Sequence, residues 1–272
     1  MVNNKNFIHE IIGTLNKEKM RKLYVVYLSF GFISISSLLL IQVINYLRNT
    51  LKLNFDVIVL LEDFLPIYIY NVQSEIVNKF KEYRVIILKS LGFKHIIFSS
   101  DFIFSCKFHR ILGDIARKVS YGKFKRGLPP QKRMNATVLD IYHLLFELSE
   151  ITYLRPNAII SGLENRNSLL LSRELTGSPE VLILLEMFPS LTGERKSSST
   201  NKNSTIFLHE SKEKIEEKMK NASRKFITAV AKILGVDPKM HICTRKLIEI
   251  LAPYREAVSH LNLKQLERYL AV

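Results

Sequence analysis

Apolar and polar residues follow one another along this chain in blocks that predict strands and helices in turn. A β-branched and aromatic run at residues 24–32 precedes a leucine-rich run at 38–47 and a continuous apolar run at 55–61. The first and third runs have strand composition, whereas the second has helical spacing. A continuous apolar run is typical of a strand that is covered on both faces. The three blocks therefore predict a strand, a crossover helix and a second, parallel strand.

The same alternation continues beyond this opening. Further strands are predicted at 95–98 and 181–185, and helices are predicted at 74–91 and 137–149. Residues 1–22 have apolar side chains on one face of a predicted N-terminal helix. Strands that alternate with helices indicate an α/β fold with a parallel sheet and crossover helices.

The last part of the chain changes in character. From Ser211 the pattern is helical and basic, it is interrupted at 235–238, and a final helical stretch covers 245–255. Ser211 is suited to cap the first of these helices. The pattern predicts a small C-terminal helical domain.

One stretch has two interpretations. Residues 23–47 contain no charged side chain and are long enough to span a bilayer of about 30 Å. Serines together with Gln42 and Asn45 dilute this run, and it divides into the strand and helix described above. We favour the buried strand and helix, and we expect no stable membrane insertion.

Composition narrows the possible partners. The chain has 272 residues, 47% of them hydrophobic, which is enough for one sizeable core and a small second module. Its 40 Lys and Arg residues exceed its 25 Asp and Glu residues and leave a net charge of +15. Such a charge favours polyanions, and RNA is the first expectation. Cys106 and Cys243 form neither a disulfide framework nor a metal-ligand pattern, so we expect a cytoplasmic location and no metal site.

A polar loop at 193–211 ends in the apolar run 206–208. Serine hydroxyls, backbone N–H groups and Lys196 are suited to bind phosphate, although such composition is more often that of a solvated linker. The order of its residues changes this interpretation. Lys196 to Thr200, KSSST, resembles the KMSKS loop of archaeal and eukaryotic-type tyrosyl-tRNA synthetases.

The resemblance covers roughly residues 20–222. Residues 24–37 stand where the family has its first strand and HIGH motif, and 55–63, FDVIVLLED, is similar to its second strand, FDIIILLAD. Residues 161–166 with 171–175 resemble the family's GGxEQR and LAREL segments. The resemblance implies a class I aminoacyl-tRNA synthetase Rossmann-like domain at 23–210 with a basic insertion at about 107–133. It also implies a homodimer and a shortened C-terminal helical domain at 211–272, with 1–22 as the N-terminal helix.

The catalytic motifs of the family are altered in this sequence. Ser34 and Ser37 stand at the two histidine positions of HIGH, Ser36 stands at its glycine position, and Val26 replaces a strand glycine. The loop keeps its lysine and hydroxyl residues, and these motif positions are Lys196, Ser198, Ser199 and Thr200. Loss of one donor that stabilises a transition state costs about 3 kcal/mol. The resemblance therefore implies an inactive protein with no cofactor. An active, divergent aminoacyl-tRNA synthetase or amino-acid ligase that uses ATP and Mg²⁺ remains the alternative.

The amino-acid pocket of the family is altered as well. The residues at its positions are Tyr24, His143, Glu147, Glu150 and Asn165. His143, Glu147 and Glu150 are spaced to share one helix face, where the family offers tyrosine, glutamine and aspartate. They form either a repurposed pocket for a cation or an amine, or a network that faces solvent or pairs with Arg155.

Residues 107–133 form the densest basic segment, with nine basic side chains against the single acid Asp114. In the family this insertion borders the dimer interface and approaches the tRNA acceptor arm, so RNA contact is expected. The candidate RNA-binding residues are Arg117, Lys118, Lys123, Lys125, Arg126, Lys132 and Arg133. The alternative is a solvated basic loop with a disordered tip at 127–130.

Overall fold

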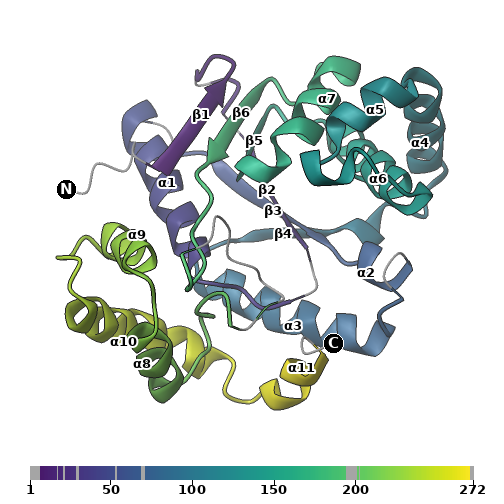
Figure 1. Ribbon diagram of the computed structural model, residues 1–272. Coiled ribbons are helices and arrows are strands. Elements are labelled where there is room, and N and C mark those ends of the chain that lie inside the picture. The colour runs from purple at the N-terminus through teal and green to yellow at the C-terminus, as the bar shows by residue number, and fades with distance from the viewer. Residues whose placement is uncertain are drawn as a thin grey trace.

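A computed structural model describes residues 7–16, 18–20, 22–28, 31–52, 54–68, 71–193, 201 and 203–269. Within these residues the strands are β1 (Ile8–Ile12), β2 (Lys22–Leu28), β3 (Asp56–Glu62), β4 (His95–Phe98), β5 (Ala158–Gly162) and β6 (Val181–Leu185). They form one sheet in the order β1-β6-β5-β2-β3-β4 (Figure 1). β2 pairs in parallel with β3 and β5, β3 pairs in parallel with β4, and β5 pairs in parallel with β6. β1 pairs antiparallel with β6.

Helices connect the parallel strands. The connections are α1 (Ser36–Leu51) between β2 and β3, α2 (Leu65–Tyr68) and α3 (Ser74–Ser90) between β3 and β4, then α4 (Cys106–Lys118), α5 (Tyr121–Gly127) and α6 (Val138–Leu154) before β5, and α7 (Arg166–Thr176) before β6. The predicted parallel α/β sheet is confirmed. The strands at 95–98 and 181–185 have the bounds of β4 and β6, and the helices predicted at 74–91 and 137–149 are α3 and α6.

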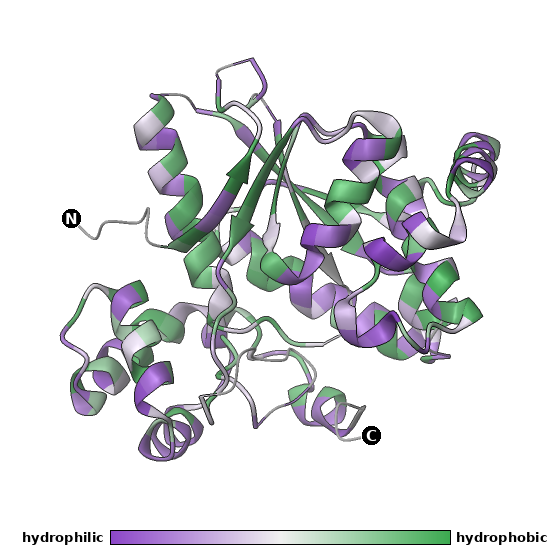
Figure 2. Ribbon diagram, turned by 45° about the horizontal axis from the view of Figure 1, so that its top comes forward, coloured by the Kyte–Doolittle hydropathy of each residue, from purple (hydrophilic) through white to green (hydrophobic). Residues whose placement is uncertain are grey.

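Alternate strand residues bury themselves on opposite faces of the sheet. Ala158 and Ile160 of β5 join a cluster that includes α1 and α3, whereas Ile159 packs with side chains of α6 and α7. This alternation follows from the pleat of a strand, in which successive side chains point to opposite faces. In Figure 2 the strands are accordingly among the most hydrophobic parts of the ribbon, and the helices around them show one apolar and one polar side.

The N-terminal helix predicted for 1–22 is wrong for the part that the structure describes. Residues 8–12 form β1, which pairs with the edge of β6 in a register that sets Ile12 opposite Leu182. Ile8, Ile11 and Ile12 fit a helical spacing of i, i+3 and i+4, but in β1 Ile8 and Ile12 are half-buried while Ile11 is 40% exposed. Pairing with β6 decides between the two patterns.

The membrane interpretation of residues 23–47 is also wrong. Most of this stretch lies in β2, at the centre of the sheet, and in α1. None of the described helices has the length and apolarity that crossing a bilayer requires.

The chain ends in four helices among the described residues, α8 (Lys212–Lys220), α9 (Arg224–Leu234), α10 (Met240–Ala257) and α11 (Leu263–Tyr269). The predicted break at 235–238 is confirmed, because Gly235 ends α9 in the left-handed conformation. In Figure 1, α8, α9 and α10 lie together near α1 and α3. Their apolar residues belong to the same buried cluster as α1 and α3.

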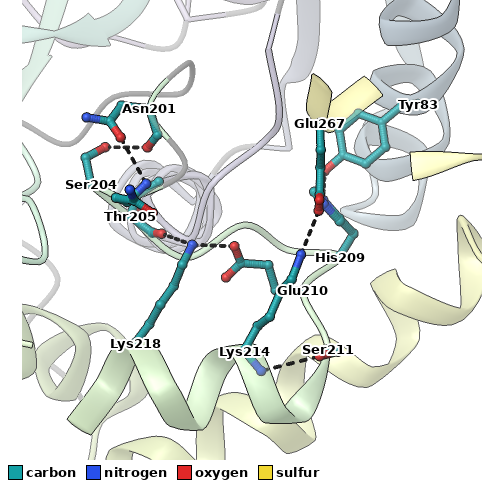
Figure 3. A network of polar contacts seen from close by, with 11 residues as sticks. Tyr83, Asn201, Ser204, Thr205, His209, Glu210, Ser211, Lys214, Lys218 and Glu267 are labelled. Atoms are coloured by element: carbon teal, nitrogen blue, oxygen red, sulfur yellow. Dashed lines mark hydrogen bonds and ion pairs between the residues drawn. The ribbon is translucent and has the colours of Figure 1, made fainter. Parts of the chain in front are cut away.

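A short buried segment leads from the polar loop to these helices. His209 accepts or donates a hydrogen bond of 2.8 Å between its Nδ1 and the Tyr83 hydroxyl of α3, and Glu210 forms a close ion pair with Lys218 of α8 (Figure 3). Lys218 Nζ also donates to the carbonyl of Thr205 at 2.7 Å. Burial lowers the pKa of His209 to about 3, so this histidine is neutral near pH 7. These contacts attach the segment to α3 and α8.

We expect Lys218→Met to lower the free energy of unfolding by about 3 kcal/mol, because the carboxylate of Glu210, only 4% exposed, would lose its buried cation. The matched control is Lys214→Met. Lys214 pairs with Glu267 at 2.8 Å, but its side chain is 49% exposed, so this variant should lose less than about 1 kcal/mol. Urea unfolding measures both variants, and equal losses would contradict the assignment.

Candidate ligand-binding site

A cavity of about 590 Å³ lies at the carboxyl ends of the parallel strands. β2 has β3 on one side and β5 on the other, so the order of the connections reverses at this point of the sheet. Open α/β sheets bind ligands in the crevice at such a switch point, and small-molecule sites have volumes of roughly 300–1,000 Å³. This cavity is therefore the candidate site.

The serines of the HIGH-like tetrad line one side of the cavity. Ser34, Ser36 and Ser37 all contribute to the lining, and the hydroxyls of Ser34 and Ser36 lie 2.7 Å apart in a hydrogen bond. Backbone bonds of 3.0 Å from Ile35 N to Ile206 O, and from Leu208 N to Ile33 O, hold the tetrad against the segment that follows the polar loop. The structure thus brings the predicted motif serines to the cavity, at the start of α1.

The part of the cavity lining that comes from α6 and the end of β3 carries carboxyl groups. His143, Glu147 and Glu150 project from one face of α6 into the lining, as their spacing predicted, and Glu62 joins them from the end of β3. Glu62 is 4% exposed and Glu150 is 1% exposed. We refer to Glu62, Glu147 and Glu150 as the acidic wall. Sequence reasoning missed Glu62, whose only signal was an acid directly after a buried strand run.

Hydrogen bonds orient part of this wall. Ser168 Oγ lies 2.8 Å from Glu147 Oε1, and Asn165 Nδ2 donates to Ser161 Oγ at 2.9 Å. Glu150 is only 1% exposed, and its carboxyl group interacts with the side chains of Ser99 and Glu62. The interpretation in which Glu150 faces solvent is therefore wrong. Arg155 lines a different groove, with Lys118 and Thr152.

Burial controls the protonation of the acidic wall. It raises the pKa of Glu150 to about 8 and also raises the pKa values of Glu62 and Glu147. The neighbouring carboxylates of Glu150 and Glu147 raise the pKa of Glu62 further, while the guanidinium of Arg84 opposes the shift. Burial lowers the pKa of His143. Near neutral pH the acidic wall therefore stays at least partly protonated, whereas glutamate side chains in water are ionised.

Tyr24 does not join this group. It packs with the apolar cluster of Ile151, Ile159 and Leu169, and burial raises the pKa of its hydroxyl. Its neighbour Val25 lines the cavity instead. Two residues of that cluster, Ile151 and Leu169, also line the cavity, so Tyr24 packs against its wall.

The KMSKS-like residues Lys196, Ser198, Ser199 and Thr200 lie outside the described residues, as does the side chain of Val26. The two ends of their loop are described. Leu191 N donates to Ser204 O at 2.8 Å, which closes the base of the loop. Gly193, at φ +88°, adopts the left-handed conformation that favours glycine.

The basic segment is folded, so the alternative of a solvated loop is wrong. It forms α4 and α5, and Phe124, Gly127 and Leu128 are buried. Several of its cations have internal partners: Arg117 pairs with Asp114, Lys123 with Glu174, Lys132 with Asp140, and Arg133 donates to the carbonyls of Leu128 and Arg126. Lys118 and Arg126 are exposed, and Lys125 lies over the ring of Tyr121.

Comparisons with known proteins agree with this geometry. The family model described as tRNA synthetases class I (W and Y) matches residues 61–270. The tyrosine–tRNA ligase of Methanospirillum hungatei JF-1 is 27% identical over 221 residues, 78% of this chain and 69% of that protein. That of Methanocaldococcus jannaschii is 24% identical over 216 residues, with the same shares of each chain. The crystal structure of tyrosyl-tRNA synthetase from Aeropyrum pernix has a TM-score of 0.80 at 16% identity and covers 99% of this chain and 96% of that chain. The predicted class I Rossmann-like fold is confirmed.

We expect the acidic wall to make stability fall as the pH rises. The pKa of Glu150 is higher in the folded than in the unfolded chain, so its contribution is complete at low pH and is lost as the pH passes about 8. Between pH 7 and pH 9 the parent should lose about 1 kcal/mol more than Glu150→Gln. Glu186→Gln, which removes an exposed acid of the same cavity, is the control. Urea unfolding at the two pH values measures the difference, and parallel pH profiles for parent and Glu150→Gln would contradict it.

Proposed function

Because the chain belongs to the family of class I tRNA synthetases for tryptophan and tyrosine, we propose that it is a tyrosyl-tRNA synthetase-like protein that does not activate tyrosine and that acts by binding RNA. The observation that carries this proposal is the acidic wall. Selection of tyrosine requires hydrogen-bonding groups matched to its hydroxyl, and such recognition is exacting. Glu62 and Glu150 crowd the inner cavity with buried carboxyl groups instead.

The serine tetrad supports the same conclusion. Adenylate formation spreads negative charge over phosphate oxygens, which preorganised donors must stabilise. Ser34 and Ser37 offer short, neutral hydroxyls, and the hydroxyl of Ser34 is already engaged with Ser36. Two weakened donors together with an acidic wall make the site a poor one for a reacting triphosphate.

Pyrophosphate exchange tests the proposal. With ATP, Mg²⁺ and tyrosine, the purified chain should exchange pyrophosphate at least about 10³-fold more slowly than the Methanocaldococcus jannaschii relative, since each lost donor accounts for a factor of roughly 10² to 10³. That relative is the positive control under the same conditions. Exchange at a comparable rate would contradict the proposal.

A second candidate is an active ligase that uses ATP and Mg²⁺ with an amine-bearing amino acid. The acidic wall favours it, because carboxylates recognise protonated amines. The same assay with each of the other amino acids separates the two candidates. Exchange that depends on one basic amino acid would replace the first proposal with this one.

Cations of α4 and α5 support RNA binding, since Lys118 and Arg126 are exposed and Lys125 is half-buried over the ring of Tyr121. Lys118, Lys125 and Arg126 extend from the segment that the family places near the tRNA acceptor arm. Contacts of lysine and arginine with phosphates do not read sequence, so we propose that structured RNAs bind with weak sequence preference. A cytoplasmic location stays a prediction that accompanies this proposal.

We expect the triple variant Lys118→Glu, Lys125→Glu, Arg126→Glu to bind an acceptor-stem hairpin at least about tenfold more weakly at moderate salt. For this variant the slope of log affinity against log salt concentration should be less negative by about 2. Each phosphate contact contributes roughly −0.7 to −0.9 to that slope. The matched control reverses Lys89, Lys94 and Lys264, which are exposed residues elsewhere. Fluorescence anisotropy measures the affinity of both triple variants for the hairpin. If the two variants weaken binding equally, the RNA does not bind at α4 and α5.

Exposed apolar side chains support a homodimer. Tyr68, Phe104, Val138, Leu139 and Tyr142 are exposed by between 41% and 82%. Phe64 connects part of this set. Its ring stacks on that of Tyr68 with 4.0 Å between the ring centroids, and it makes an edge-to-face contact with Phe104 at a centroid distance of 5.6 Å. Monomeric proteins rarely expose a large contiguous apolar patch, and we propose a second copy of this chain as the occupant.

Val138→Asp combined with Tyr142→Asp should convert the dimer to a monomer, because both changes place charge in the buried interface. Met240→Asp, which changes an exposed apolar residue of α10, should leave the dimer intact. Light scattering gives the mass of each species. A monomeric parent chain, or a dimeric double variant, would contradict the proposal.

A further inference from the structure

We propose that the ring of Tyr121 in α5 stacks on an unpaired base of the bound RNA, so that the basic surface prefers an RNA in which a single-stranded segment adjoins a duplex. This inference rests on the proposed RNA binding by α4 and α5. It adds a contact with bases to a surface whose cations contact phosphates.

Tyr121 carries an exposed aromatic ring in a segment without acidic side chains. Tyr121 is 58% exposed, whereas Phe124, the other aromatic residue of α5, is 4% exposed. Between Asp114 and Asp140 the sequence contains seven Lys and Arg residues and no acid. Proteins that bind single-stranded nucleic acids combine such cations, which contact the backbone, with aromatic rings on which bases stack. The surroundings of Tyr121 therefore match a nucleotide.

Lys125 connects this ring with the cations. Its Nζ lies 5.3 Å from the centroid of the Tyr121 ring, and the two residues are neighbours on α5 at i and i+4. The attraction between an ammonium group and the face of an aromatic ring keeps the two side chains together. A base that stacks on the ring brings its own phosphate close to this ammonium group. The exposed Lys118 and Arg126 belong to the same two helices and can contact further phosphates.

The helix α5 is fixed to the body of the protein, and in Figure 1 it lies beside α7. Phe124 packs in a buried cluster with Leu144 of α6 and Leu171 of α7. Gly127 comes so close to these two leucines that a Cβ there would lie 2.7 Å from Leu171 and 2.8 Å from Leu144. A packed helix thus presents the ring, so stacking does not first have to order a loop.

The ring and the cations require different parts of an RNA. Within a duplex the bases are stacked on one another, whereas the bases of loops, bulges and ends can turn out onto aromatic side chains. The cations contact the phosphates of duplex and single strand alike. Because every base has a flat face on which a ring can stack, the contact with Tyr121 selects unpaired bases without selecting their sequence. This agrees with the weak sequence preference proposed above.

Fluorescence anisotropy on the full chain tests the inference with three forms of one RNA hairpin. The first is blunt, the second has a short single-stranded extension at its 5′ or 3′ end, and the third has the same extension built from abasic nucleotides. The abasic extension is the matched control, because it keeps the phosphates and lacks the bases. We expect the second form to bind at least about fivefold more tightly than the third, which is the low end of the effect of stacking one base.

Tyr121→Ala should abolish the difference between the extended and the abasic hairpins. It should leave the slope of log affinity against log salt concentration unchanged, because it removes no positive charge. Tyr121→Phe keeps the ring and should bind all three hairpins as the parent does. Met134→Ala shortens a residue that is 88% exposed and directly follows the basic segment, and it should change binding less than twofold.

Three results would overturn the inference: equal binding of the extended and abasic hairpins by the parent, an equal effect of Tyr121→Ala on all three hairpins, or a change in the mass of Tyr121→Ala by light scattering. The last result would place the ring in a contact between copies of the chain. The comparison of the two extensions needs no variant, so it decides the matter even if Tyr121→Ala does not fold.

The two proposals fail separately. If the parent binds no hairpin, or if the triple variant of Lys118, Lys125 and Arg126 binds as the parent does, the proposed RNA binding by α4 and α5 is wrong. If binding depends on these cations but not on unpaired bases, only the stacking inference is wrong.

Discussion

The backbone pairing of residues 33–35 with residues 206–208 fixes one side of the cavity and connects it to the rest of the chain. Two hydrogen bonds of 3.0 Å hold the serine tetrad against the segment that follows the polar loop. That segment continues into His209 and Glu210, which contact α3 and α8. A shift of the C-terminal helices would therefore break buried hydrogen bonds beside the cavity. Because unpaired buried groups are costly, these parts are held in one arrangement.

The electrostatics of the molecule differ between its surface and its cavity. Cations on α4 and α5 face solvent, where they attract polyanions and where salt screens them. The carboxyl groups of Glu62 and Glu150 lie in a low-dielectric interior, where burial raises their pKa values. A cavity of about 590 Å³ admits a small molecule but not an RNA helix. The proposed RNA-binding surface and the cavity thus use different parts of the chain.

Sequence reasoning succeeded where one periodicity was long and uncontested. The helices α3 and α6 were predicted for this reason, and the short strands β4 and β6 were predicted from their unbroken apolar composition. β5 was missed because the apolar run of Ala158–Gly162 ends in a small polar residue and glycine. The face shared by His143, Glu147 and Glu150 follows from helical spacing alone. Glu62 could not be assigned to it, because its contribution depends on which strand ends lie at the same edge of the sheet. Tyr24 was assigned by resemblance, and it packs against Ile151 and Leu169 of the lining, whereas Val25 lines the cavity itself.

The changes in the motifs and in the pocket act in the same direction. Serines at the two HIGH histidine positions remove groups that could carry positive charge toward phosphate. Glu62 adds a carboxyl group where the family pattern FDIIILLAD has alanine. Simple loss of activity would not require the cavity to stay open. The cavity of about 590 Å³ nevertheless stays open, and its acidic wall is the opposite of what the phosphates of a nucleotide require.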